Sequence, residues 1–127
     1  MTLVGHDHEN SPGAHSSGAT LELPWPPTLN TYWRRVGAKT ILSAKAREYR
    51  GQVAAACAMQ ATDRLGAARV RLTITAHPPD RRRRDLDNLN KAVLDALVFA
   101  RVFDDDSQVD DLRIVRAEPR AGGALTV

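Results

Sequence analysis

The sequence contains little cysteine and no long apolar run, and each of these absences excludes a class of protein. Only one of its 127 residues is cysteine, Cys57, so no disulfide can form within the chain, and the Cys/His spacing of a zinc site is absent. No apolar segment approaches the length that crosses a bilayer, and the N-terminus lacks the apolar region of a signal peptide. We therefore expect no membrane association and a location in the reducing cytoplasm.

Lysine is also scarce, although the chain is basic. Of 18 basic residues only Lys39, Lys45 and Lys91 are lysine, and the sequence pI is about 9.5 with a formal net charge of +3. The planar guanidinium of arginine suits bidentate contacts with phosphate, so the composition favours nucleic acid as a partner. A chain from a GC-rich genome, in which arginine replaces lysine throughout, explains the arginine excess equally well.

The first 19 residues differ in composition from the rest. They are rich in Gly, Ser, His and Asn and hold few apolar residues, so we expect a disordered leader over residues 1–19. Its histidines, His6, His8 and His15, are typical of a flexible tail rather than of a metal site. Residues 20–127 are long enough for one domain with one core, and they contain no internal repeat.

The first half of this domain predicts one strand and one helix. Residues 20–23 alternate in polarity and predict a short strand, which the proline-rich stretch 24–27 ends because proline cannot donate to a ladder. A polar and aromatic loop follows. Ser43 can cap a helix that keeps apolar residues at helical spacing to about Leu65, with Gly66 as its stop.

The second half predicts a strand, a helix and further strands. Residues 70–76 alternate strictly between apolar and polar and predict a half-buried strand. A second helix is expected from about Asp87 to Ala100, a strand around 112–118 and a short one at 125–127. The fold class predicted is therefore α+β, a small mixed β-sheet with two helices packed on it.

Acidic residues are concentrated in one part of the chain. Nine of the 15 lie between Asp80 and Asp111, mainly in the clusters Asp85–Asp87 and Asp104–Asp106. Such clusters repel themselves unless arginines or a cation compensate the charge. The run Arg81–Arg84 directly precedes the first cluster, and carboxylates are preferred ligands of Mg²⁺ and Mn²⁺.

The spacing of three residues indicates a site for phosphodiester cleavage. If Asp85 ends an extended segment and Asp87 opens the helix, their carboxylates can converge, and Lys91 lies one helical turn further along. A metal held by two carboxylates activates water and polarises phosphate, and a nearby ammonium stabilises the negative charge of the transition state. Asp106 would have to return in space to supply a further ligand.

Structural interpretations of the same residues stay open at this point. Asp87 can cap the helix, and Asp87, Lys91 and Asp95 can form an exposed charge ladder at i,i+4 spacing. The run Asp104–Asp106 can be a solvated loop. The arginines Arg81–Arg84 either contact a DNA backbone or neutralise the neighbouring aspartates in a solvated turn.

Four segments of the sequence carry a resemblance to a known family. Residues 81–91, Arg-Arg-Arg-Arg-Asp-Leu-Asp-Asn-Leu-Asn-Lys, are followed by Leu94–Leu97 and by Asp105–Val109, and the earlier segment Leu23–Trp33 begins Leu-Pro-Trp-Pro-Pro. Together they resemble the RusA family of Holliday junction resolvases over about residues 20–120. One departure is Arg101, at a position just after the helix where the family often has glycine, so a left-handed helix cap there would be strained.

The resemblance implies a function and a set of site residues. Members of the family are small dimeric, Mg²⁺-dependent endonucleases of bacteria and their phages, which nick four-way DNA junctions symmetrically during recombination and repair. By resemblance, Asp85 and Asp87 match the paired catalytic carboxylates, Lys91 the essential lysine and Asp106 the downstream carboxylate, with Asp105 beside it. We therefore expect Mg²⁺ (or Mn²⁺) to be bound by Asp85, Asp87 and Asp106.

The expected partners are branched DNA and a second copy of the chain, because two equivalent strands must be cut by two equivalent sites. The residues expected to contact DNA are Arg81, Arg82, Arg83, Arg84, Asn30, Tyr32 and Lys45. Two alternatives remain: a protein that binds branched DNA without cutting it, and a nuclease for other structured nucleic acids.

Overall fold

The structure is a computed structural model, which describes residues 2–6, 18–28 and 33–127. Two of the expected DNA contacts, Asn30 and Tyr32, lie outside the described residues, as does most of the predicted leader. Among the described residues, neither helix combines the length and the apolar character needed to span a bilayer.

The fold is built around one central strand, β6 (Arg69–His77). Val70, Leu72, Ile74 and Ala76 are fully buried, whereas the residues between them are partly or fully exposed. This alternation is the one predicted from the sequence. It means that a single face of the sheet carries the core and that the other face is open to solvent.

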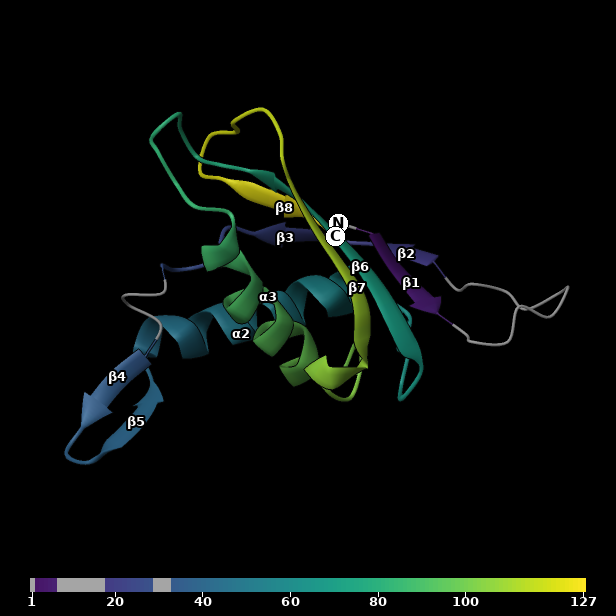
Figure 1. The fold of residues 1–127 in the computed structure, drawn as a ribbon, viewed down its shortest axis with the longest axis horizontal. Helices are drawn as coiled ribbons and strands as arrows, with labels where there is room; N and C mark the ends of the chain where they lie inside the picture. The colour runs from purple at the N-terminus through teal and green to yellow at the C-terminus, as the bar shows by residue number, and fades with distance from the viewer. Residues whose placement is uncertain (1, 7–17, 29–32) are drawn as a thin grey trace, which may run out of the picture.

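Other strands flank β6 on both sides (Figure 1). On one side β7 (Val109–Arg116) runs parallel to it, and on the other β1 (Thr2–His6) and β8 (Ala124–Thr126) run antiparallel, one after the other. Two outer strands, β2 (Gly18–Thr20) and β3 (Glu22–Pro24), pair with β1 and β8. The result is a mixed sheet, effectively four strands wide, which confirms the predicted α+β class.

Strand β1 differs from the sequence prediction. Residues 1–19 were expected to be a disordered leader, yet Thr2–His6 pair with β6 from Arg69 to Thr73, and Gly18–Thr20 form β2. A further unpredicted element is the hairpin of β4 (Trp33–Val36) and β5 (Lys39–Leu42), which extends away from the main sheet (Figure 1).

Helix α2 (Ala44–Met59) begins as predicted and ends earlier. The Ser43 hydroxyl accepts a hydrogen bond from a backbone N–H of the first turn at 3.1 Å. The predicted end near Leu65 is wrong: Ala61 adopts a left-handed conformation with φ +49°, which turns the chain out of the helix. Gly66 is also left-handed, but it belongs to a later turn.

Helix α3 (Asp87–Phe99) agrees closely with the predicted range and ends in a Schellman motif. The N–H of Arg101 donates to the Val98 carbonyl, and the N–H of Val102 to the Leu97 carbonyl, each at 3.0 Å. Arg101 has φ +62°, so the left-handed cap is kept although the residue is not glycine. The strain expected at this position is therefore present in the fold.

The two helices cover the core face of the sheet and are tied to each other. Their buried residues join those of β6 in one apolar cluster. Arg50 of α2 forms a bidentate ion pair with Asp95 of α3, with N–O distances of 2.8 and 2.9 Å, and its guanidinium lies 5.1 Å from the ring centre of Phe99. This packing holds α3 at a fixed position against the sheet, and α3 carries the predicted site at its start.

Candidate functional site at the start of helix α3

A cavity of about 510 Å³ opens at the N-terminal end of α3. Three stretches far apart in the sequence form it: the proline-rich stretch after β3, the stretch from the end of β6 through the arginine run to the first turn of α3, and the end of β7. Its lining residues are Trp25, Pro26, Pro27, Thr28, Pro78, Arg83, Arg84, Asp85, Leu86, Asn88, Leu89 and Arg116. The cavity therefore lies where the sequence predicted chemistry.

The proline-rich stretch is held in place from two sides. The Tyr49 hydroxyl of α2 donates to the Pro24 carbonyl at 2.9 Å. On the other side Gly123 touches Trp25 so closely that a Cβ at Gly123 would lie 2.8 Å from the Trp25 Cβ and 3.1 Å from Pro79 Cδ. With φ +74° at this position as well, only glycine fits without strain. Trp25 is therefore part of a fixed wall.

The first acidic cluster lies at the entrance to helix α3. Leu86 occupies the N-cap position in a helical conformation without a side-chain cap, and the Asp85 carbonyl accepts from the Asn88 N–H at 3.3 Å. Asp87 is the first helical residue, so it is not the capping residue that the structural interpretation proposed. Both residues are exposed, and Asp85 lines the cavity.

Lys91 lies one helical turn after Asp87 and is exposed. Over the part of the chain that the structure describes, its ammonium makes no hydrogen bond or ion pair. The charge ladder with Asp95 is not formed, because the Asp95 carboxylate is held by Arg50 instead. Lys91 is therefore available to an anion that approaches the start of α3.

Most of the arginine run compensates acids other than the predicted ones. Arg84 approaches the Asp80 carboxylate at 2.5 Å and Arg82 approaches it at 3.7 Å. The Arg84 hydrogen bond, aided by the Arg82 backbone N–H, lowers the pKa of Asp80 to about 2. Arg81 reaches Glu118 at 3.4 Å in an exposed pair, which contributes little to stability. Neutralisation thus falls on Asp80 and Glu118, not on Asp85 and Asp87.

Two arginines instead present charge to the cavity. Arg83 lines it and makes no hydrogen bond or ion pair among residues 2–6, 18–28 and 33–127. Arg116, at the end of β7, lines it too, and donates to the Arg84 carbonyl at 2.6 Å. Sequence reasoning missed Arg116 and Trp25, because neither lies near Asp85 in the chain; only the parallel pairing of β7 with β6 brings Arg116 there.

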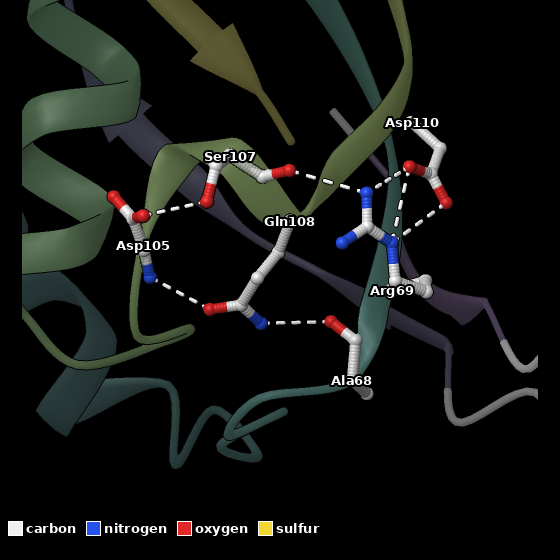
Figure 2. Close-up of polar contacts among 6 residues, drawn as sticks. All are labelled: Ala68, Arg69, Asp105, Ser107, Gln108 and Asp110. Atoms are coloured by element: carbon white, nitrogen blue, oxygen red, sulfur yellow. Dashed lines mark hydrogen bonds and ion pairs between the residues drawn. The ribbon is translucent and has the colours of Figure 1, made fainter.

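The second acidic cluster is a hydrogen-bonded turn (Figure 2), and its three aspartates are exposed to solvent, as the solvated-loop interpretation expected. Asp106 opens the short 3₁₀ helix η1 (Asp106–Gln108). The buried Gln108 side chain accepts from the Asp105 N–H and donates to the Gly66 and Ala68 carbonyls, each at 2.7 Å. The Ser107 hydroxyl donates to the Asp105 carboxylate at 2.5 Å and lowers the pKa of Asp105.

Within one chain, Asp106 does not join Asp85 and Asp87. Helix α3 has 13 residues, which corresponds to a length of about 20 Å, and η1 follows its far end (Figure 1). Among the described residues, no group of three or more His, Cys, Asp or Glu side chains is gathered closely enough to hold a metal. Lys45 is likewise elsewhere, exposed in the first turn of α2 and outside the cavity.

Comparison with known proteins gives one consistent family. The family model described as endodeoxyribonuclease RusA matches residues 24–124, a range that includes every residue of the cavity. Proteins named crossover junction endodeoxyribonuclease RusA match from Enterobacteria phage HK97 (43% identical over 105 residues) and from Escherichia coli K12 (44% over 106). A third, from Enterobacteria phage 82, is 45% identical over 105 residues. These matches cover 83–84% of this chain and 88% of each relative.

Proposed function

This chain belongs to the RusA family of endodeoxyribonucleases, and we propose that it resolves four-way DNA junctions by paired nicks in the cytoplasm of a bacterium or a phage-infected cell. The observation that supports this most is the arrangement at the start of α3. There Asp85 and Asp87 are exposed, Lys91 follows Asp87 by one helical turn without a partner among the described residues, and Asp85 lines a cavity together with arginines. Acids and cations together suit a phosphodiester substrate and its metal.

Asp85 and Asp87 fit a divalent cation by their chemistry. Mg²⁺ is commonly bound through one or two carboxylates together with the phosphates of the substrate, and both side chains are exposed. We propose that they hold Mg²⁺, with Mn²⁺ as a substitute. When bound, the ion would lower the pKa of a coordinated water and polarise the phosphate.

The basic residues would position the DNA. Arg83 and Arg116 can bind the backbone through their guanidinium groups, while the Lys91 ammonium offsets the negative charge that develops on the phosphate being cut. Arg81, Arg82 and Arg84 extend the positive surface although they also pair with acids. Lys45 remains a proposed contact with a more distant arm of the junction.

We further propose that a second copy of the chain completes the acidic set. Strand β7 pairs with β6 along one edge, and no described strand pairs with its other edge. Two β7 strands paired antiparallel across a two-fold axis would bring the start of one, beside Asp106, towards the end of the other, at Arg116. Arg116 lines the same cavity as Asp85. Each site would then combine Asp85 and Asp87 of one copy with Asp106 of the other.

The function is tested with a labelled four-way junction, with and without Mg²⁺. We expect symmetric nicks with Mg²⁺ only, junction binding without cleavage for Asp87→Asn, and normal cleavage for the matched control Asp63→Asn, an exposed acid outside the cavity. Normal cutting by Asp87→Asn would refute the site. Binding of the junction without any cleavage by the unmodified protein would support a non-cleaving junction binder, and preferential cleavage of flaps or RNA would support a different substrate.

The shared site is tested by mixing two inactive variants. A dimer of one Asp87→Asn copy and one Asp106→Asn copy would contain one intact site and one doubly substituted site. We expect the mixture to regain cleavage of one strand per junction. A mixture of Asp85→Asn with Asp87→Asn is the control and should stay inactive. If the first mixture also stays inactive while both variants bind the junction as dimers, the shared site is refuted.

A further inference from the structure

The cavity at the start of α3 is lined by residues of two chemically different kinds. Trp25, Pro26, Pro27 and Pro78 contribute an aromatic residue and three prolines. Arg83 and Arg116 contribute two cations. The segments that form it lie at the end of the sheet where α3 begins (Figure 1). A ligand that fills the cavity must therefore combine a flat apolar part with an anion.

A single nucleotide has this combination. Nucleobases stack on aromatic faces with little dependence on sequence, and guanidinium groups bind phosphate through two donors. A volume of about 510 Å³ is in the range of cavities that take small molecules and cofactors, and it is too small for a base pair with its backbone. The ligand would have to be a base outside the stack, as enzymes that act on single bases require.

We propose that this cavity binds one unpaired nucleotide of the junction, with its base on Trp25 and its phosphate on Arg83 and Arg116. The inference rests on the proposed function, since a base pair at the crossover point of an open four-way junction lacks a stacking neighbour on one side, so that extruding its base costs less than within a continuous duplex. Asp85 lines the same cavity, so the bound nucleotide lies next to the phosphate that is cut. Trp25 thereby acts as a specificity-determining residue, because the fit of the base decides at which sequence the strand is cleaved.

The cavity is built before any ligand enters. Trp25 is fixed against Gly123, and the N–H of Gly123 donates to the Arg120 carbonyl at 2.8 Å, which closes the turn behind the indole. The hydrogen bond from Arg116 to the Arg84 carbonyl, at 2.6 Å, anchors the Arg116 side chain. A preformed site loses little conformational entropy on binding, so a modest stacking contact suffices to select a base.

The first test measures sequence preference. Junctions that carry each possible dinucleotide at the crossover are cleaved by the wild type, by Trp25→Ala and by Trp25→Phe. We expect Trp25→Ala to reduce the ratio between the best and worst sequences by about tenfold while cleavage persists, and Trp25→Phe to retain most of it. The control Phe99→Ala removes an exposed aromatic residue at the far end of α3 and should leave the ratio unchanged.

Arg116→Gln separates the phosphate contact from the base contact. Because a phosphate contact carries no sequence information, this variant should weaken binding to all sequences to the same extent and reduce its salt dependence. If Arg116→Gln changes the sequence ratio and Trp25→Ala does not, the assignment of the base to Trp25 and of the phosphate to Arg116 is refuted.

A second readout does not depend on cleavage. A junction with 2-aminopurine at the crossover is bound to Asp87→Asn, with or without the additional Trp25→Ala substitution. We expect the fluorescent base to be quenched by Trp25 and to brighten several-fold in the double variant. Equal fluorescence in the two proteins overturns the nucleotide site even if the junctions are cleaved normally. Quenching in a protein that never cleaves would retain the nucleotide site and refute the proposed function instead.

Discussion

Replacing Arg101 by glycine should stabilise the domain. Arg101 ends α3 with φ +62°, and its side chain is exposed and makes no hydrogen bond or ion pair within the described residues. The left-handed conformation costs an L-residue about 1–2 kcal/mol, and glycine avoids this cost. Glycine also gains freedom in the unfolded chain, which offsets about 0.5–1 kcal/mol. The free energy of unfolding should therefore rise by about 0.5–1 kcal/mol.

Urea denaturation followed by circular dichroism measures this difference, with the unfolding midpoint rising and the slope unchanged. Ala58→Gly is a matched control, because Ala58 is exposed and lies within the right-handed part of α2. That control should lose about 0.5–1 kcal/mol. The reasoning fails if Arg101→Gly destabilises the protein as much as the control does.

Three further substitutions test other parts of the structure. Gln108→Leu leaves the Gly66 and Ala68 carbonyls and the Asp105 N–H without the partner that each has at 2.7 Å, so the free energy of unfolding measured in urea should fall by about 2–4 kcal/mol. A fall of less than about 1 kcal/mol would mean that water replaces the amide. The carboxyl of Asp80 has its pKa lowered to about 2 from 3.8, so the stability that it contributes is present above pH 4 and is lost as the pH falls through 2. The melting temperature of Asp80→Asn should therefore fall less between pH 4 and pH 2 than that of the wild type, and parallel curves would contradict this. Gly123→Ala places a methyl group 2.8 Å from Trp25 Cβ at φ +74°, and should cost about 1–3 kcal/mol and change the near-ultraviolet spectrum of the indole; an unchanged spectrum would argue against the fixed wall.

The elements predicted correctly are those whose sequence pattern coincides with their burial. Strand β6 alternates because one of its faces is buried along its whole length, and α3 repeats apolar residues because one of its faces packs on the core. The end of α2 was not predictable in this way, since Ala61 turns the chain without a glycine signal. Strand β1 has no pattern of its own, because its pairing is supplied by β6, more than sixty positions away.

The residues of the candidate site also differ in whether local sequence or long-range packing sets their positions. Asp85, Asp87 and Lys91 lie at or near the start of α3, so their places in the fold follow from local spacing, while their shared role stays a prediction. The position of Asp106 depends on the length of α3 and on the turn after it, and there the expectation of a return within one chain is not met. Arg116 and Trp25 reach the cavity only through strand pairing and the close contact at Gly123, which no local pattern encodes.

The pairing of β3 with β8 has a consequence for how the protein folds. It joins Glu22 to Thr126, residues separated by 104 positions, so this ladder must close a very long loop before its contacts contribute. The unit β6–α3–β7 spans fewer than fifty residues and can form earlier. Gly123 immediately precedes β8, so Trp25 becomes fixed only when that late ladder forms. A partly folded chain would therefore already contain the acidic residues at the start of α3, but not the cavity that Trp25 completes. The ability to select a DNA sequence would be acquired in the last step of folding.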